Sequence, residues 1–457
     1  MIDTIAAIST PLGEGGIGVI RVSGPDAVEI VDKVFVPAGK GAGYLKTVPS
    51  HTVHYGHIIT DQGDYIDEVL VTVMRAPRTY TREDTVEISC HGGITPVRAV
   101  LERVLEAGAR LAEPGEFTKR AFLNGRIDLA QAEAVIDIIR SKTRASQEIA
   151  LRNLHGELSQ RVTEIRESLL QALMYLEASI DFPEDEIPPL EEDLGVILKT
   201  IKQRLEELID TARTGRVYRE GLATVIAGKP NVGKSSLLNA LVQEERAIVT
   251  NIPGTTRDLL EVEVNLNGLP LRIIDTAGIR LTHDEVEKIG VARSKQALER
   301  ADIILFLVDV AEGTNEEDFH IAEVLPPEKT ILVGNKIDEG KNVDLSALFR
   351  RFGAPVFISA QEKTGLDKLK EAIISKAALL EISSAEVVFV TNVRHLDALR
   401  RAKEAVEAAT HSHQEGLAAD FITIDLHAAV DALGEITGDS ASDDLVNRIF
   451  ASFCIGK

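Results

Sequence analysis

The chain has 457 residues, of which 44% are hydrophobic and only 4% aromatic, so several domains rich in aliphatic helices are expected. Its formal net charge of −22 argues against broad electrostatic binding of nucleic acid, although a local basic patch remains possible. The two cysteines, Cys90 and Cys454, exclude a disulfide framework and fit a reducing compartment. The longest apolar run, residues 303–308, is far shorter than the roughly 20 residues of a membrane span. We therefore expect a cytoplasmic protein with no membrane partner.

Short β-like runs separated by turn residues occupy the first part of the chain. Residues 18–22, 68–74 and 85–90 have this pattern, which predicts an α+β domain over residues 1–118. The hexapeptide Gly-Glu-Gly-Gly-Ile-Gly at residues 13–18 spells a dinucleotide-binding fingerprint. That fingerprint requires a helix directly after it, whereas the residues that follow have a strand pattern, so we interpret it as a turn.

The hydrophobic period changes to that of helices after this domain. Leucine, isoleucine and valine residues between positions 151 and 180 recur every three or four residues and predict a single long helix of a bundle. Residues 182–193 combine prolines with acidic residues, and we interpret them as a solvated connector.

Short apolar strands then alternate with helical stretches between about residues 221 and 374. This alternation predicts a mostly parallel sheet with helices on both faces. Because helical periodicity returns near the C-terminus, the simplest architecture is an all-α helical domain that an inserted α/β domain interrupts. The predicted boundaries are 119–215 and 381–457 for the helical domain and 216–380 for the insertion.

Residues 228–235, Gly-Lys-Pro-Asn-Val-Gly-Lys-Ser, match the Walker A pattern between an expected strand at 223–227 and a helix starting near Ser236. In such a loop the backbone N–H groups surround the β-phosphate, Lys234 reaches the β- and γ-phosphate oxygens, and Ser235 coordinates Mg²⁺. The nucleotide-binding residues predicted in this segment are Gly228, Asn231, Val232, Gly233, Lys234, Ser235 and Ser236.

A second motif, Asn335-Lys336-Ile-Asp338, follows the expected strand at 330–333 and selects the base. A carboxylate at this sheet edge accepts hydrogen bonds from guanine N1–H and N2–H₂, whereas adenine would leave it unpaired. Such a mismatch costs several kcal/mol, so ATP should be rejected. The guanine-side contacts predicted are Asn335, Lys336 and Asp338, together with Ser359, Ala360 and Gln361 after the last strand.

Two further segments complete the pattern of a translation-factor-like GTPase. Residues 275–278 end an expected strand and supply an acid for the Mg²⁺ water shell and an N–H group for the γ-phosphate. The loop 254–258, Gly-Thr-Thr-Arg-Asp, is similar to switch I and offers Thr256 as the second Mg²⁺ ligand. Ile279 stands where Ras-like enzymes carry the water-orienting glutamine, so hydrolysis needs other help. The nucleotide contacts predicted here are Asp275, Thr276, Ala277 and Gly278.

Three segments in addition to the interrupted helical domain resemble the MnmE family of tRNA-modifying GTPases, within the TrmE-Era-EngA type. They are residues 114–134, the loop 254–258 and the tail Phe-Cys-Ile-Gly-Lys at 453–457, so that the similarity extends over essentially the whole chain. The resemblance implies a homodimer that works with the flavoprotein MnmG, as a heterotetramer, in carboxymethylaminomethyl modification at C5 of the wobble uridine of certain tRNAs. GTP turnover would open and close paired G domains.

The resemblance also implies that hydrolysis is stimulated by K⁺, held by Asn231 and by oxygens of Thr250, Ile252 and Thr255. Thr250 and Thr255 thereby join the predicted nucleotide-binding residues. A monovalent cation near the β/γ bridge would do the electrostatic work of an arginine finger. The family's water-orienting acid corresponds to Glu287. Judged without the resemblance, Asn231 would be an ordinary P-loop residue and Glu287 a solvated helix charge.

The N-terminal domain of this family serves dimerisation and resembles folate-binding modules that hold a 5-formyl-tetrahydrofolate-like one-carbon donor. The positions that match its ligand contacts are Arg21, Glu87, Arg126 and Lys457. Cations suit the glutamate carboxylates of a folate, and a carboxylate suits the pterin's N–H groups. Cys454 has two interpretations: a small buried hydrophobe, or a functional thiol with a catalytic role near the folate.

Two other functions remain open from the sequence. A ribosome-assembly GTPase or other RNA-binding regulatory GTPase would usually carry an appended RNA-binding module, and none is evident. A folate-dependent one-carbon enzyme with a vestigial GTPase would be active without GTP.

Overall fold

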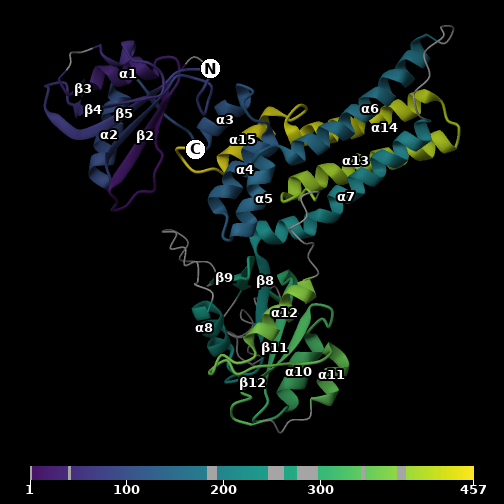
Figure 1. The fold of residues 1–457 in the computed structure, drawn as a ribbon. Helices are drawn as coiled ribbons and strands as arrows, with labels where there is room; N and C mark the ends of the chain where they lie inside the picture. Colours follow the sequence, from purple (N-terminus) through teal and green to yellow (C-terminus); the bar gives the residue numbers. More distant parts are fainter. Residues whose placement is uncertain are drawn as a thin grey trace, which may run out of the picture. The chain divides into compact units, whose positions relative to one another are not determined.

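The computed structural model describes residues 3–39, 43–182, 193–244, 262–274, 297–340, 345–377 and 387–457. These residues form two compact units, each built from separate stretches of the chain (Figure 1). The first unit comprises Met1–Ile136, Leu154–Arg166 and Val430–Lys457, and the second Asp137–Asn153 and Glu167–Ala429. Within the described residues, no helix combines the length and the apolar character needed to cross a membrane.

A seven-stranded sheet in the order β3-β4-β5-β6-β2-β1-β7 dominates the first unit, and all its neighbours are antiparallel except β1 and β7. Its strands are β1 (Ile5–Ile8), β2 (Ile17–Ser23), β3 (Phe35–Pro37), β4 (Thr52–Ile59), β5 (Tyr65–Met74), β6 (Thr85–His91) and β7 (Arg110–Leu111). Because side chains alternate along a strand, Val69, Val71 and Val73 of β5 enter the core while Leu70 stays exposed.

Two helices, α1 (Ala27–Val34) and α2 (Ile94–Glu106), cover the buried face of this sheet. A short 3₁₀ helix, η1 (Leu45–Thr47), adds Leu45 to the same apolar core. The closest approach is at Gly18, where an added Cβ would lie 2.3 Å from Val97 of α2. The stretch 13–18 therefore leads into strand β2, as predicted, and not into a nucleotide-binding helix.

The remaining helices of the first unit come from both ends of the chain. They are α3 (Glu116–Leu123), the start of α4 (Leu129–Arg140) and α15 (Asp443–Ala451). Phe450 and Phe453 pack against the apolar residues of α3 and α4. Beyond them the tail reaches β1, because an added Cβ at Gly456 would lie 2.2 Å from the Ile8 carbonyl oxygen. The C-terminal residues therefore lie against strand β1 of the N-terminal domain.

Long helices form the helical part of the second unit. They are α5 (Arg144–Leu154), α6 (Glu157–Asp181), α7 (Leu194–Glu220), α13 (Val393–Gln414) and α14 (Ala419–Thr437), of which α6 and α14 extend into the first unit. The single helix predicted over residues 151–180 is wrong, because α5 ends at Leu154 and α6 begins at Glu157. Gly156 adopts a left-handed φ of 92°, which interrupts the helix. The acidic connector lies mostly outside the described residues.

The inserted domain contains a six-stranded sheet in the order β13-β12-β11-β8-β10-β9, parallel except for the β9–β10 pair. Its strands are β8 (Leu222–Ala227), β9 (Val262–Leu266), β10 (Leu269–Ile274), β11 (Ile303–Asp309), β12 (Thr330–Asn335) and β13 (Val356–Phe357). Its described helices are α8 (Lys234–Glu244), α10 (Glu316–Val324), α11 (Ser346–Phe352) and α12 (Leu366–Ala377).

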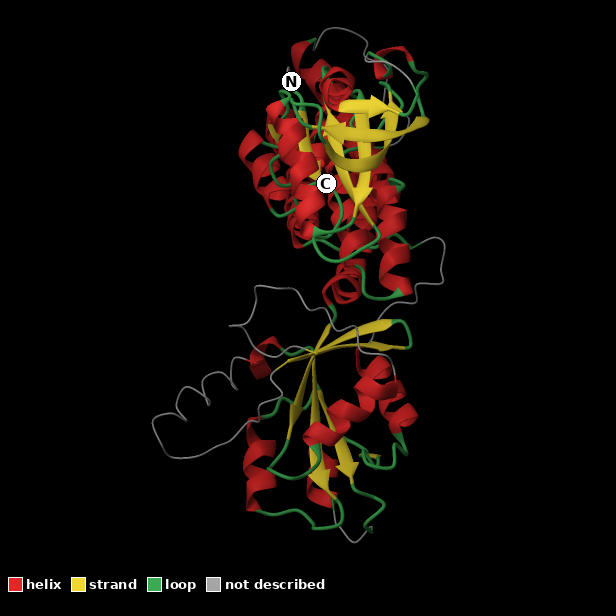
Figure 2. Cartoon of the chain, turned by 90° about the vertical axis from the view of Figure 1, so that its left-hand side faces the viewer, coloured by secondary structure: helices red, strands yellow, loops and turns green. Residues whose placement is uncertain are grey.

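Two apolar clusters, one on each face of this sheet, hold the helices in place. Helices α8 and α12 belong to one cluster, and α10 and α11 to the other. Figure 2 shows helices on both sides of the strands. The fold class predicted from the sequence is confirmed: an α+β N-terminal domain, an all-α domain and an inserted α/β domain.

Candidate functional site

The Walker A loop connects β8 to α8 at the carboxyl edge of the parallel sheet, where open α/β sheets bind ligands. Three of its residues have positive φ, which is 149° at Gly228, 64° at Asn231 and 98° at Gly233. Helix α8 begins at Lys234, slightly earlier than the sequence predicted. The first-turn N–H groups of α8 therefore face the loop, as an anion site requires.

Lys234 curls back over the loop that precedes it. Its Nζ donates hydrogen bonds to the carbonyl oxygens of Gly228, at 2.6 Å, and Lys229, at 2.7 Å. Ser235 and Ser236 are exposed at the start of α8. An ammonium group, exposed hydroxyls and helix N–H groups together make a donor set that fits a phosphate chain with Mg²⁺.

Asn335 joins the phosphate side of the site to the base side. Its side-chain nitrogen donates to the Val232 carbonyl oxygen at 2.7 Å, and its side-chain oxygen accepts from the Ala360 N–H at 3.0 Å. Only 2% of Asn335 is exposed. A Cβ at Gly233 would lie 2.2 Å from that nitrogen, so the loop can pass beneath Asn335 only with glycine there. Three motifs that are far apart in sequence are thereby brought into one site.

The predicted guanine-side residues lie around this amide. Asp338 is exposed and makes no hydrogen bond or ion pair with any described residue, so its carboxylate is available to a base. Ser359 is fully buried, and its hydroxyl accepts from the Glu362 N–H, whereas Gln361 is exposed. Their role in binding the base stays a prediction.

Lys336 is held by an acid at the end of the neighbouring strand. Its Nζ lies 2.6 Å from the Asp309 carboxylate. Burial alone would raise the pKa of Asp309, but Lys336 and the N–H groups of Glu312 and Ala311 outweigh it and lower that pKa. Asp309 therefore stays ionised and fixes the loop between β12 and the base site.

A buried ion pair that the sequence did not predict supports the Walker A loop. Lys229 is 5% exposed, and its Nζ lies 3.3 Å from the carboxylate of the fully buried Asp318 on α10. The same ammonium contacts the Gly313 carbonyl oxygen and the Glu312 carboxylate, each at 3.4 Å. Lys229 occupies a variable position of the Walker A pattern, so the pattern does not predict this ion pair. The structure also places Asp318 in a capping box with Asn315 at the start of α10.

Several predicted residues lie outside the described part of the chain. They include the second Mg²⁺ ligand, three K⁺ ligands, the acid motif after β10 and the water-orienting acid. These residues are Thr250, Ile252, Thr255, Thr256, Asp275, Thr276, Ala277, Gly278 and Glu287, and their roles stay predictions.

The four residues predicted to contact a folate gather in the first unit. Arg21 and Glu87 face each other across β2 and β6, with Nη2 and Oε1 2.8 Å apart. The guanidinium carbon of Arg21 lies 5.5 Å from the centre of the Tyr80 ring, and that of Arg126 lies 4.8 Å from it. Tyr80, which the sequence did not single out, is thus shared by two of the predicted cations.

The C-terminal tail brings the remaining residues to this cluster. The Gly456 carbonyl oxygen accepts hydrogen bonds from the Ser9 hydroxyl, at 3.2 Å, and from Arg21, at 3.5 Å. Burial is the main reason that the pKa of Lys457 is lowered, and the positive charge of Arg21 lowers it further. The charges of Glu87 and Cys454 act in the opposite direction. Two guanidinium groups and an ammonium as donors, a carboxylate as acceptor and an aromatic ring together fit a folate.

Cys454 is exposed, so its interpretation as a buried hydrophobe is wrong. Its carbonyl oxygen accepts a hydrogen bond from the Gly115 N–H at 3.3 Å, which ties the thiol-bearing turn to the start of α3. The catalytic role of this thiol stays a prediction.

Known proteins match this chain over its whole length. A family model described as the MnmE helical domain matches residues 129–454, and one described as the N-terminus of the GTP-binding protein TrmE matches residues 4–126. The tRNA modification GTPase MnmE of Desulforamulus reducens is 51% identical over all of this chain and 99% of its own length. The same-named proteins of Geobacillus thermodenitrificans and Staphylococcus aureus are 50% and 48% identical, over all of this chain and at least 99% of their own length. The chain therefore belongs to the MnmE family of tRNA modification GTPases.

Proposed function

We propose that this chain binds and hydrolyses GTP and, together with MnmG, takes part in carboxymethylaminomethyl modification at C5 of the wobble uridine of certain tRNAs. The observation that carries the nucleotide part is the bridging role of Asn335. By holding Val232 and Ala360 at once, it couples the phosphate loop to the guanine-side loop. Asp338 beside it supplies the carboxylate that distinguishes guanine from adenine.

The chain's own groups would do the following when GTP binds. Lys234 exchanges the carbonyl oxygens of Gly228 and Lys229 for phosphate oxygens, while the Ser235 hydroxyl holds Mg²⁺. When bound, Mg²⁺ neutralises charge that develops on the phosphates. Preorganised donors at this point lower the barrier to phosphoryl transfer, because they need no reorientation.

The proposal includes a K⁺ ion at Asn231 and water orientation by Glu287. Asn231 is exposed, has a left-handed backbone, and its side chain makes no hydrogen bond with the described residues. It lines a hollow of about 630 Å³ with Lys229, Asp309 and Lys336. Such a side-chain oxygen is available to a monovalent cation, which Thr250, Ile252 and Thr255 would also hold.

The N-terminal domain is proposed to hold a 5-formyl-tetrahydrofolate-like donor and to form the homodimer. The folate proposal rests on four charged residues. Arg21 and Arg126 lie against the Tyr80 ring, Glu87 is paired with Arg21, and Lys457 is influenced by the charges of Arg21 and Glu87. The dimer proposal rests on the outer face of β4 and β5, where four large apolar side chains are exposed among the described residues. These are Val53, Tyr55, Tyr65 and Leu70. An apolar patch of this kind is typical of an interface.

Phosphate release from GTP, measured in KCl and in NaCl, tests the nucleotide part. We expect faster release in KCl and no release with ATP. Equal rates in both salts would remove the potassium mechanism. Formation of modified wobble uridine, measured with purified MnmG in the presence or absence of GTP and of the folate, tests the rest. Modification without GTP would favour a folate enzyme with a vestigial GTPase, and GTP hydrolysis without any modification would favour a regulatory GTPase.

A further inference from the structure

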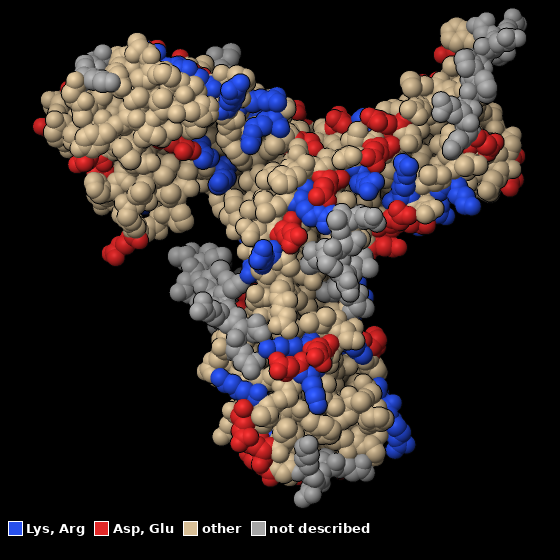
Figure 3. Space-filling view, viewed as in Figure 1, with Lys and Arg blue, Asp and Glu red and all other residues tan. Residues whose placement is uncertain are grey.

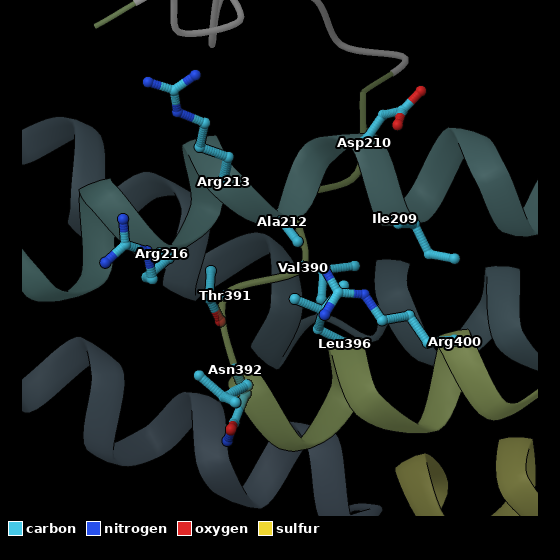
Figure 4. A pocket seen from close by; sticks show the side chains of 11 residues that line it. Ile209, Asp210, Ala212, Arg213, Arg216, Val390, Thr391, Asn392, Leu396 and Arg400 are labelled. Carbon is cyan, nitrogen blue, oxygen red and sulfur yellow. The ribbon is translucent and has the colours of Figure 1, made fainter. Parts of the chain in front are cut away.

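A cavity of about 390 Å³ lies between α7 and the segment that leads into α13 (Figure 4). Helix α7 runs directly into β8, and residues 387–392 lead back from the inserted domain to α13. The cavity therefore lies where the chain enters and leaves the GTP-binding domain. None of its lining residues belongs to the nucleotide site or to the folate cluster.

Three arginines line this cavity, and two of them have no partner in the part of the chain that the structure describes. Arg216 is paired with Asp302, with the nitrogen and oxygen 2.6 Å apart. Arg213 of α7 and Arg400 of α13 form no ion pair or hydrogen bond with any described residue. Figure 4 shows their side chains leaving the two different helices that border the cavity. Among its lining residues only Asp210 is acidic, so the charge of the cavity is positive.

The walls of the cavity are held in place by close packing. The Val390 N–H donates to the buried Thr211 hydroxyl of α7 at 3.0 Å. An added Cβ at Gly215 would lie 2.2 Å from the Val390 carbonyl oxygen, so the segment passes so close to α7 that only glycine fits at position 215. Ala212, Val390 and Leu396 add apolar surface. The wall between α7 and residues 390–396 is thus fixed, whereas the side chains of Arg213 and Arg400 are exposed, and in Figure 4 that of Arg213 points away from Val390. The arginines must therefore turn onto the phosphate when it binds, against a wall that needs no rearrangement.

The start of α13 adds to the positive potential. This helix begins at Val393, and the Asn392 side chain caps it by accepting from the Arg394 N–H at 3.0 Å. The N-terminal end of a long helix carries a partial positive charge. Two guanidinium groups that have no partner among the described residues, a helix N-terminus and a cavity with a fixed wall together are suited to a phosphate group, which guanidinium binds through paired N–H donors.

We propose that this cavity binds a phosphate group and that Arg213 and Arg400 are its ligands. The phosphate belongs to the backbone of the bound tRNA, so this inference rests on the proposed function. The chain carries a net charge of −22, and on the face drawn in Figure 3 the basic side chains of the described residues form separate groups. A polyanion must therefore be held at local sites of unpaired cations. Binding here would link the tRNA to both connections of the GTPase domain.

Arginine footprinting of the full-length protein tests the site directly. The protein is loaded with GDP and Mg²⁺, so that the Walker A loop is occupied, and treated with a dicarbonyl reagent alone, with tRNA or with inorganic phosphate. Labelling of Arg213, Arg400 and the control Arg204 is then read by mass spectrometry of the peptides. Arg204 lies on the same helix, is exposed and has no partner among the described residues. We expect tRNA to protect Arg213 and Arg400 but not Arg204.

Protection of Arg213 and Arg400 by inorganic phosphate alone would assign the site to free phosphate and overturn the tRNA source. Absence of protection by either ligand would overturn the site itself. If wild-type protein showed no tRNA binding at all, the proposed function would fail instead, and the phosphate arm would still decide whether an anion site exists.

Salt-dependent binding gives an independent readout. The double variant Arg213→Gln/Arg400→Gln is compared with Arg204→Gln/Lys199→Gln, which removes two exposed charges from α7 away from the cavity. For the first variant, at ~50 mM NaCl, tRNA affinity should fall about tenfold and the slope of log affinity against log salt should decrease by about 1. Equal losses in both variants would contradict the proposal. Unchanged GDP affinity and circular dichroism would show that both variants are folded.

Discussion

Replacing Asp318 by asparagine tests whether the buried ion pair beneath the Walker A loop positions that loop. Asp318 is fully buried, and one of its carboxylate oxygens has no hydrogen-bond partner among the described residues. The other lies 3.3 Å from Lys229 and also accepts from the Asn315 N–H at 3.1 Å. Asparagine preserves the shape and can keep the second of these contacts, so the change isolates the charge.

The size of the effect follows from what remains around Lys229. Removing one partner of a buried pair costs roughly 3–5 kcal/mol, because the other charge stays desolvated. Lys229 keeps Glu312 at 3.4 Å, but that carboxylate is 71% exposed and water screens it. We therefore take the lower end, about 3 kcal/mol, which corresponds to an upper limit of roughly 150-fold in affinity.

Nucleotide affinity measures this cost. The apparent affinity falls in proportion to the fraction of protein molecules whose Walker A loop can still bind nucleotide. By calorimetric titration with GDP and Mg²⁺, we expect Asp318→Asn to bind ~10-fold to 150-fold more weakly than wild type. The double variant Lys229→Met/Asp318→Leu, which removes both charges, should recover to within about tenfold of wild type. Glu312→Gln, at the exposed partner, should change affinity less than about twofold. A wild-type affinity in Asp318→Asn, or a double variant weaker than the single one, would refute the positioning role.

Asp338→Asn should weaken GTP binding and hydrolysis by roughly two orders of magnitude, because it removes the acceptor of two guanine donors, and competition with xanthosine triphosphate should show a gain for that base. Burial raises the pKa of the Cys90 thiol to about 11, whereas Cys454 is exposed. Iodoacetamide at pH 8 should therefore modify only Cys454 in the native protein, as mass spectrometry of the peptides would show; native labelling of Cys90 would contradict its burial. Burial alone would raise the pKa of Glu116, but hydrogen bonds from Arg110, the backbone and Arg120 outweigh it, so that pKa is lowered from its ordinary value of 4.5. A lowered folded-state pKa means that this carboxylate stabilises the first unit above pH 4.5, and that the stabilisation is lost as the pH falls below it. Limited proteolysis between pH 3 and 6 should show this loss in wild type and a shallower dependence in Glu116→Gln.

The sequence by itself determined the parts of the site that depend on local geometry. The strand, loop and helix around residues 228–235 follow from backbone rules within a few residues, and so does the position of Asp338 after β12. The alternation of strands and helices likewise predicted the doubly covered sheet. The folate cluster was implied by family resemblance and not by spacing, since residues 21, 87, 126 and 457 have no periodic relation.

Only the tertiary structure decided which distant charges meet. It paired Lys229 with Asp318 and placed both Arg21 and Arg126 against the Tyr80 ring. It also left two arginines at the cavity beside α7 without a partner among the described residues. It also showed two helices where the apolar pattern predicted one over 151–180, because Gly156 has a left-handed backbone. The physical reason is that hydrophobic periodicity and loop motifs act over a few residues, whereas burial and ion pairing depend on how separate segments pack.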